Sequence, residues 1–262
     1  HTSVTDNVIT NDSSGADSPA SFVAWTSPLN GTWGTLTDNG LGGYTYTLHD
    51  DASVQALNKG EHQTDTFTYT MQDADGDIKT ATLTVTVNGS NDDPTIVVHT
   101  GNPENSNDTV YEAGLTGGTQ AGEAETHAGG TFTLGDADGL SNIAGITIGT
   151  TTIAIADLGN NNVINGSNGT LTITHYDSNT GEVTYTYDLT SPVGNAVGSD
   201  AGSDNFTVTV NDADGGSNSA NIVIDIVDDK PVARDDSASV TEDTHTSVTD
   251  NVITNDSSGA DS

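Results

Sequence analysis

Residues 67–87 read FTYTMQDADGDIKTATLTVTV, and residues 206–226 read FTVTVNDADGGSNSANIVIDI. On both sides of the shared Asp-Ala-Asp-Gly step, apolar residues alternate with polar ones. Alternation with a period of two is typical of a half-buried β-strand, and an Asp-Gly step supplies the positive φ angle that a tight turn needs. Each stretch is therefore predicted to form a β-hairpin.

The same alternation recurs along the rest of the chain, where Asn-Gly, Asp-Gly and Gly-Gly steps separate the alternating runs. Thr, Val, Ile and Tyr, which fit a pleated surface, dominate these runs. Helical spacing is nearly absent, and only residues 51–57 are expected to form a short helical turn. The sequence thus predicts an all-β chain of tandem immunoglobulin-like β-sandwich domains stacked end to end. Strands are expected to include residues 44–48, 67–71, 83–87, 171–173, 183–187, 206–210 and 222–226.

Each predicted hairpin is followed by an acidic junction that ends in proline. The junctions read NDDP at residues 91–94 and DDKP at residues 228–231. Proline sets the entry of the next strand without needing a ladder hydrogen bond, so these junctions are expected to be short linkers between domains. The expected division is a sandwich lacking its first strand over residues 1–94, a complete sandwich over 95–229, and the opening strand or strands of the next repeat over 230–262.

An exact duplication links the two ends of the chain. Residues 1–18 read HTSVTDNVITNDSSGADS, and residues 245–262 repeat this string unchanged, at a spacing of 244 residues. Self-similarity at a fixed spacing predicts an array of near-identical units, of which this chain is one unit and the start of the next. An artificial duplication is disfavoured, because the sequence leading into the second copy reads as natural strand and turn.

The charge balance is strongly acidic, with 38 Asp and Glu against four Lys and Arg and a formal net charge of −34. Nucleic acids and anionic membranes are disfavoured as partners, because both require clusters of basic side chains. Such a charge opposes the compact state, so a counter-ion is expected, and divalent cations are natural candidates. There is no cysteine, which excludes disulfides and thiolate metal sites. No apolar run is long enough for direct membrane insertion, and no signal peptide is visible.

Two longer stretches resemble a known class of repeat. They are DADGDIKTATLTVTVNGSNDDP at residues 73–94 and NFTVTVNDADGGSNSANIVIDIVDDKPVARDDSASVTED at residues 205–243. They resemble the VCBS-type and related cadherin-like repeats that form the extender regions of giant RTX adhesins exported by type I secretion. The resemblance implies an immunoglobulin-like, calcium-binding spacer at the bacterial cell surface, which projects a distant ligand-binding domain from the outer membrane for adhesion and biofilm formation. The glycine-rich nonapeptide of the secretion block is absent, so the chain would belong to the extender.

Three acidic loops are candidate calcium sites. Calcium prefers six to eight oxygen ligands, and Asp-x-Asp places two carboxylates on one side of a loop. Asp-Gly is also ordinary turn chemistry, but three loops of the same sequence and paired acids at both junctions favour calcium. The candidate ligands are Asp73, Asp75 and Asp77; Asp136 and Asp138; Asp212 and Asp214; and the junction residues Asp92, Asp93, Asp228 and Asp229.

Topology predicts which of these acids meet. In a sandwich with its termini at opposite ends, the last hairpin turn lies beside the preceding linker. Asp212 and Asp214 are then expected to face Asp92 and Asp93. In the same way, Asp228 and Asp229 are expected to face the 73–75 loop of the next repeat.

Two weaker assignments complete the metal hypothesis. Asp136 and Asp138 are predicted to pair with Glu112 inside the second domain. Glu242 and Asp243 are predicted to play the equivalent part in the split domain.

Other functions are less well supported. The carboxylate pairs could suggest a glycosidase, but they lie in turns with ligand-like spacing, and no catalytic motif is present, so no enzymatic activity is expected. Trp25 and Trp33 flank an Asn-Gly turn and could form a sugar platform, although core packing is favoured. The alternative function is a module that itself binds carbohydrate or protein.

The split first domain predicts an exposed sheet edge. Residues 231–262 contain the missing strand, so neighbouring copies of the repeat are the expected partners, and head-to-tail strand complementation between molecules is possible. The sequence does not decide which copy of the duplicated segment pairs in the split domain.

Overall fold

The computed structural model describes residues 2–99, 108–194, 201–243 and 247–260. The outer residues of the two duplicated segments, at positions 1, 245–246 and 261–262, lie outside this range. The chain is all-β, as predicted, and divides into two units. The first unit contains residues 1–92 and 137–139, and the second contains residues 93–136 and 140–262. Within the described residues, no helix is long and apolar enough to span a membrane.

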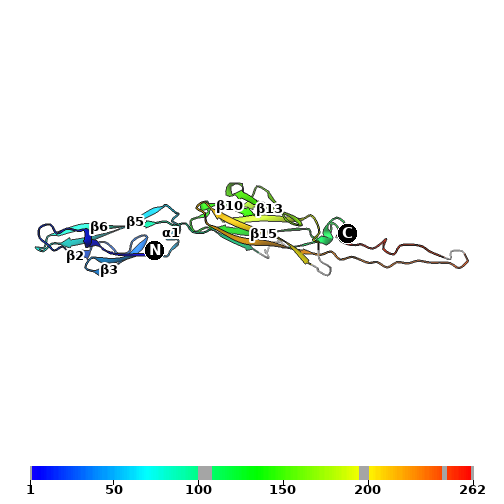
Figure 1. Cartoon of the computed structure of the whole chain (residues 1–262), viewed down its shortest axis with the longest axis horizontal. Helices are drawn as coiled ribbons and strands as arrows, with labels where there is room; N and C mark the ends of the chain where they lie inside the picture. Colours follow the sequence, from blue (N-terminus) through cyan, green and yellow to red (C-terminus); the bar gives the residue numbers. More distant parts are fainter. Residues whose placement is uncertain (1, 100–107, 195–200, 244–246, 261–262) are drawn as a thin grey trace. The chain divides into compact units, whose positions relative to one another are not determined.

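The first unit is a sandwich of two three-stranded sheets, with orders β1-β4-β3 and β2-β5-β6 (Figure 1). The expected helical turn is α1, which is capped by the Asp51 carboxylate. The elements are β1 (Ser3–Asn7), the 3-10 helix η1 (Val8–Asn11), β2 (Ser21–Trp25), β3 (Gly34–Gly40), β4 (Gly43–Leu48), α1 (Ala52–Gln55), β5 (His62–Gln72) and β6 (Ile78–Asn88).

The second unit is larger and has two five-stranded sheets, with orders β11-β10-β15-β16-β8 and β12-β13-β14-β9-β7. All pairings are antiparallel except that of β8 with β16. The elements are β7 (Thr95–His99), β8 (Thr109–Tyr111), η2 (Glu112–Gly114), β9 (His127–Gly135), η3 (Leu140–Asn142), β10 (Ile143–Ile148), β11 (Thr151–Ala154), η4 (Ile155–Asp157), β12 (Asn162–Asn165), β13 (Gly169–Tyr176), β14 (Glu182–Leu189), β15 (Ala201–Asp212) and β16 (Ser217–Val227).

The predicted alternation determines which side chains enter each core. In β5 the buried positions are every second residue, including Phe67, Tyr69 and Met71, while the intervening Thr residues point outward. In β15 Phe206, Val208 and Val210 are buried in the same way. Alternate side chains of a strand point to opposite faces of the sheet, so the pattern fills a core between two layers.

The same alternation also buries one aspartate in each unit. Asp65 is 5% exposed and Asp204 is 1% exposed, and each lies two residues before a core phenylalanine of its strand. A buried carboxylate is tolerated only when donors surround it. The surrounding donors therefore explain much of the local structure.

In the first unit, the Asp65 carboxylate accepts hydrogen bonds from three consecutive backbone N–H groups and from a tyrosine. The donors are the N–H groups of Thr32 (2.8 Å), Trp33 (3.0 Å) and Gly34 (3.1 Å), and the Tyr46 hydroxyl (2.7 Å). The turn approaches so closely that a Cβ at Gly31 or Gly34 would overlap Asp65 or Tyr46. Glycine is therefore required at both turn positions.

The second unit repeats this arrangement with different residues. The Asp204 carboxylate accepts from the N–H groups of Asn168 (3.0 Å) and Gly169 (3.1 Å) and from the Tyr187 hydroxyl (2.7 Å). In both units the sequence order is Asn-Gly-x-x-Gly, Tyr-Thr-Tyr-x-Leu and Asp-x-Phe-Thr, so β3, β4 and β5 correspond to β13, β14 and β15.

The two copies of the duplicated segment adopt different structures. In the first copy, residues 3–7 pair with β4 as β1, and Val8 is buried. In the second copy, described residues 247–260 form no strand, and Ser257 makes an isolated bridge with Val232. The first copy is thus the one that pairs in the first unit.

We expect Asp204→Ala to lower the free energy of unfolding of the second unit by about 3–5 kcal/mol, because it leaves buried N–H groups and the Tyr187 hydroxyl without an acceptor. Asp225→Ala, on the exposed face of β16, is the matched control and should cost no more than about 0.5 kcal/mol. Urea unfolding followed by the amide NMR signals of the second unit measures both. Equal losses in the two variants would contradict this role for Asp204.

Alkaline pH should weaken the first unit. Burial and the hydrogen bond to Asp12 raise the pKa of Tyr69 from 10.0 to about 12, and burial together with Asp65 raises that of Tyr46 further. Because both phenols ionise more readily when unfolded, their contribution is complete below the unfolded pKa and is lost as pH rises through the folded one. Urea midpoints should fall between about pH 10 and 12, and Tyr69→Phe should reduce that fall. A midpoint independent of pH over this range would contradict it.

Candidate metal centre

The turn between β5 and β6 is built around the Asp73 carboxylate. Its Oδ1 accepts from the N–H groups of Gly76 (3.1 Å) and Asp77 (2.8 Å), and the Asp73 N–H donates to the Asp77 carbonyl (3.2 Å). Gly76 has a φ of 98°, a conformation that glycine adopts without strain. Asp77 thus contributes its backbone to the turn.

A third acid approaches this turn from the loop before β2. The Ala74 N–H donates to the Asp17 carbonyl at 3.0 Å. Carboxylate oxygens of Asp17, Asp73 and Asp75 all lie within 4.8 Å of one another. Asp73 and Asp75 were predicted as ligands, but Asp17 was not. Its loop has no paired acid, and only the fold places it beside the turn.

The close approach of these acids changes how they titrate. A hydrogen bond from Asp75, followed by the turn's N–H groups, lowers the pKa of Asp73. The hydrogen bond with Asp73 and then its negative charge raise the pKa of Asp75. The two carboxylates therefore lie close enough for the ionisation of one to oppose that of the other.

The second unit contains the same turn. The Asp212 Oδ1 accepts from the N–H groups of Asp214 (2.9 Å), Gly215 (2.6 Å) and Gly216 (2.8 Å). The Ala213 N–H donates to the Asn142 carbonyl at 2.9 Å, so Asn142 braces this turn as Asp17 braces the first.

Four predicted ligands lie at one end of the second unit. Thr95, the first residue of β7, pairs with Gly135, and Ile143 of β10 pairs with Asp212. The short loop from residue 136 to residue 142 joins these two strand ends. Asp93, Asp136, Asp212 and Asp214 therefore all belong to this end.

The predicted pairing of Asp136 and Asp138 with Glu112 is wrong. Glu112 is fully buried at the other end of the second unit, where its Oε1 accepts from the Val193 N–H at 2.7 Å. The Tyr111 N–H donates to the Glu125 carbonyl, and the nine residues of β9 then separate this end from Asp136. Asp138 instead accepts from the Asp92 N–H at 2.9 Å, a contact within the first unit as divided above.

The remaining candidates have separate surroundings. Asp229, at 6% exposure, accepts from the N–H groups of Thr119 (2.7 Å) and Ala260 (3.0 Å) within the second unit. Asp228 is partly buried beside it, and Glu242 and Asp243 are exposed. The predicted contacts of Asp212 and Asp214 with the junction, and of Asp228 and Asp229 with the next repeat, stay predictions.

The two tryptophans belong to the core of the first unit. Trp25 contacts the rings of Phe22, Tyr44 and Tyr69, with centroids 5.6–6.2 Å apart, and Trp33 packs against the same cluster. Because both tryptophans pack in the core, an aromatic sugar platform is not supported.

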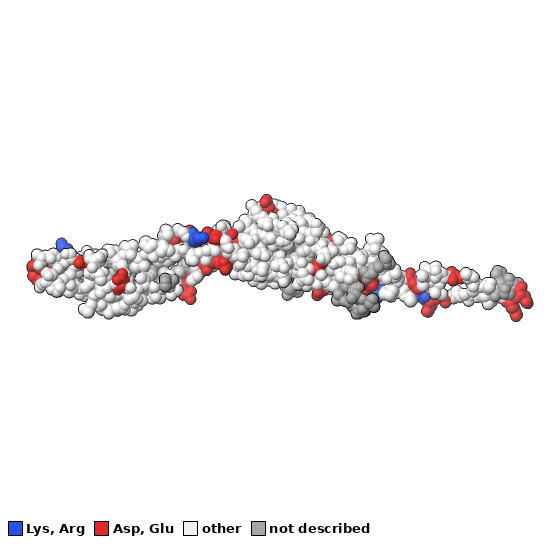
Figure 2. Space-filling model, in the orientation of Figure 1, with Lys and Arg blue, Asp and Glu red and all other residues white. Residues whose placement is uncertain are grey.

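Figure 2 shows a surface where Asp and Glu are scattered and Lys and Arg are few.

A family model described as "Bacterial Ig domain" matches residues 1–86. Among solved structures, mouse clustered protocadherin PcdhgC3 EC1-3 is 15% identical with a TM-score of 0.37, covering 85% of this chain and 59% of that chain. PcdhgB3 EC1-4 is 14% identical with a TM-score of 0.41, covering 82% and 42%. The fibronectin(III)-like modules of Clostridium thermocellum CbhA are 14% identical with a TM-score of 0.24, covering 78% and 80%. No curated protein matches.

The family match is to residues 1–86, and the paired sheets of each unit form an all-β sandwich of immunoglobulin-like type. The chain spans 59% of the protocadherin fragment named first. Immunoglobulin-like sandwiches include many structural and adhesive domains of cell-surface proteins.

The opposite pKa shifts of Asp73 and Asp75 give a direct test. In a carboxyl NMR titration Asp75 should titrate above the ordinary Asp range and Asp73 below it. Asp73→Asn should return Asp75 toward its ordinary value of 3.8, because the paired charge is gone. Ordinary titration of Asp75 in the unmodified chain would show that the two carboxylates do not interact.

Proposed function

We propose that this chain is a calcium-rigidified spacer, or extender, of a bacterial surface adhesin that projects a distal ligand-binding domain for adhesion and biofilm formation. The observation that carries the proposal is the cluster of Asp17, Asp73 and Asp75, on a turn that recurs in the second unit. The sequence resemblance to extender repeats of RTX adhesins supports export to the cell surface.

The donor set of this cluster fits calcium. Two ligands of one calcium ion lie no more than about 5 Å apart, because each bond is about 2.3–2.6 Å long. The three carboxylates satisfy this limit. They are hard oxygen ligands, and backbone carbonyls and water are the usual complement to six or more.

Calcium at this position would act on the fold through charge. The hydrogen bond with Asp73 and then its negative charge raise the pKa of Asp75. A divalent cation would offset the repulsion among the three carboxylates and so join the loop before β2 to the turn between β5 and β6. Two segments 56 residues apart, at Asp17 and Asp73, would thereby be held together.

The acids of the second unit extend the proposal. Asp93, Asp136, Asp212 and Asp214 gather at one end of a sandwich, where calcium would offset their mutual repulsion. We propose that these acids, with Asp92 and Asp138, stiffen the junction within the repeat, and that Asp228 and Asp229 serve the junction to the next repeat.

Thermal unfolding in calcium and in excess chelator tests the proposal. At a calcium concentration about a hundred times the Kd, a bound ion stabilises the folded state by about 2.7 kcal/mol, which corresponds to a rise in Tm of roughly 10 °C. Asp75→Asn should remove most of the rise in the first unit, and Asp50→Asn, an exposed acid of the same unit, is the control. An identical Tm with and without calcium would overturn the metal assignment.

A further inference from the structure

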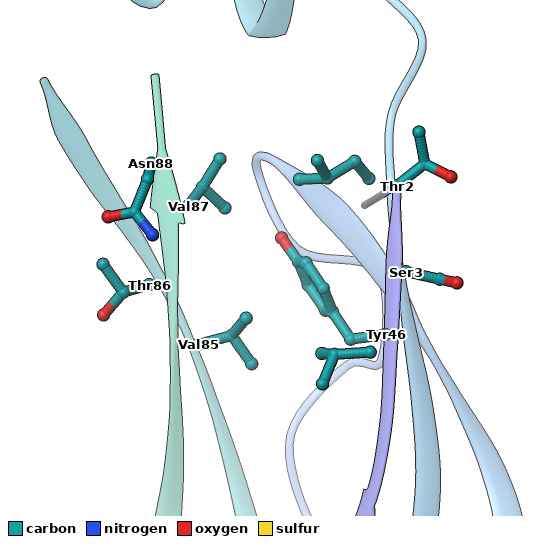
Figure 3. A pocket seen from close by; sticks show the side chains of 9 residues that line it. Thr2, Ser3, Tyr46, Val85, Thr86, Val87 and Asn88 are labelled. Atoms are coloured by element: carbon teal, nitrogen blue, oxygen red, sulfur yellow. The ribbon is translucent and has the colours of Figure 1, made fainter. Parts of the chain in front are cut away.

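A groove of about 330 Å³ opens between the two sheets of the first unit. Val85 and Val87 of β6 form one wall, and Tyr46 and Leu48 of β4 form the other. Figure 3 shows the side chains of Val85 and Val87 pointing across the gap toward Tyr46. The groove is thus an opening into the sandwich with two apolar walls, and Thr2, Ser3, Thr86 and Asn88 add polar groups to its lining.

The groove lies beside a sheet edge. In the order β2-β5-β6, β6 is the last strand, so β5 pairs with one side of it and no strand of the described residues pairs with the other. An unpaired edge next to a groove with apolar walls can accept an added strand, because main-chain hydrogen bonds and a side-chain pocket are both available.

The second unit shows which strand belongs there. Its corresponding strand, β16, is covered on the outer side by β8 in parallel register, with Asp225, Ile226 and Val227 opposite Thr109, Val110 and Tyr111. Val110 is fully buried. The second unit is therefore complete at the edge where the first unit is open.

The open edge is the same stretch of strand. Counting from the shared Asp-Ala-Asp-Gly turn, the three β16 residues that pair with β8 correspond to Thr86, Val87 and Asn88 of β6. These three residues line the groove. The groove is therefore the position that β8 occupies in the second unit.

The tail of the chain contains a match for β8. Residues 109–112 read TVYE, and residues 239–242 read SVTE. Val240 corresponds to the buried Val110 but is 59% exposed in the tail. In this segment Thr241 forms only an isolated bridge, and Val240 has no buried position in the tail.

Topology places this segment beside the groove. In the second unit the chain passes from β8, in one sheet, to β9, which pairs with β14 in the other. In the first unit β1 takes the place of β9 by pairing with β4, and Thr2 and Ser3 at its start line the groove. Residues 239–244 directly precede the second copy of this β1 sequence.

We propose that the groove binds residues 239–242 of a second copy of this chain as a strand parallel to β6, with Val240 in the place that Val110 takes in the second unit. The contact joins the tail of one chain to the first unit of the next, and it does not require calcium.

Sedimentation equilibrium of the full chain in chelator tests this contact. The average mass should rise above that of one chain as the concentration approaches about 1 mM, Val240→Asp should abolish the rise, and Val252→Asp should not. Val252 is the matched control because it is 65% exposed in the same tail and its substitution adds the same charge. A chain that stays monomeric at about 1 mM, or equal behaviour of the two variants, overturns the proposal.

A second chain design separates strand insertion from other association. Residues 231–244 placed ahead of His1 should fill the groove within one molecule, raise the Tm of the first unit by roughly 5 °C and suppress self-association. Val240→Asp in the added segment should reverse both effects. Association that persists in the extended chain would locate the contact elsewhere and refute the proposal.

Discussion

Asp65 and Asp204 each place a carboxylate on the buried face of a strand, two residues before the core side chain of Phe67 or Phe206. Removing such a charge from water is costly, and it is tolerated here because a glycine turn and a tyrosine hydroxyl from the opposite sheet all donate to it. The carboxylate therefore joins three segments that are distant in sequence. The close approach of the turn and the orientation of the Tyr46 or Tyr187 hydroxyl follow from satisfying the buried acid of each unit.

Much of this architecture could be predicted from the alternation of apolar and polar residues. The runs at residues 67–71 and 206–210 fall inside β5 and β15, and the short helix follows its Asp51 cap. The buried acids could have been found as well, because Asp65 and Asp204 lie in phase with Phe67 and Phe206. They are recognised by asking which polar residues fall on the same face of a predicted strand as its buried apolar residues.

The candidate metal centre was only partly predictable. Asp73 and Asp75 follow from local spacing, since an Asp-x-Asp turn determines its own geometry. Asp17 does not, because it reaches the turn only when the loop before β2 packs against the end of β5. The assignment of Glu112 was wrong for a related reason. The nine residues of β9 separate Glu112 from Asp136, and nothing in the sequence around either acid indicates that separation.

The duplicated segment separates what a sequence encodes by itself from what it acquires from its surroundings. In both copies an asparagine side chain accepts from the N–H two residues later, at Asn7 and at Asn251, and the following threonine hydroxyl bonds back to the same asparagine carbonyl. Val8 is nevertheless 6% exposed and its twin Val252 is 65% exposed. The asparagine turn is thus encoded by the local sequence, whereas burial of the valine depends on the packing of the first unit, in which β1 pairs with β4.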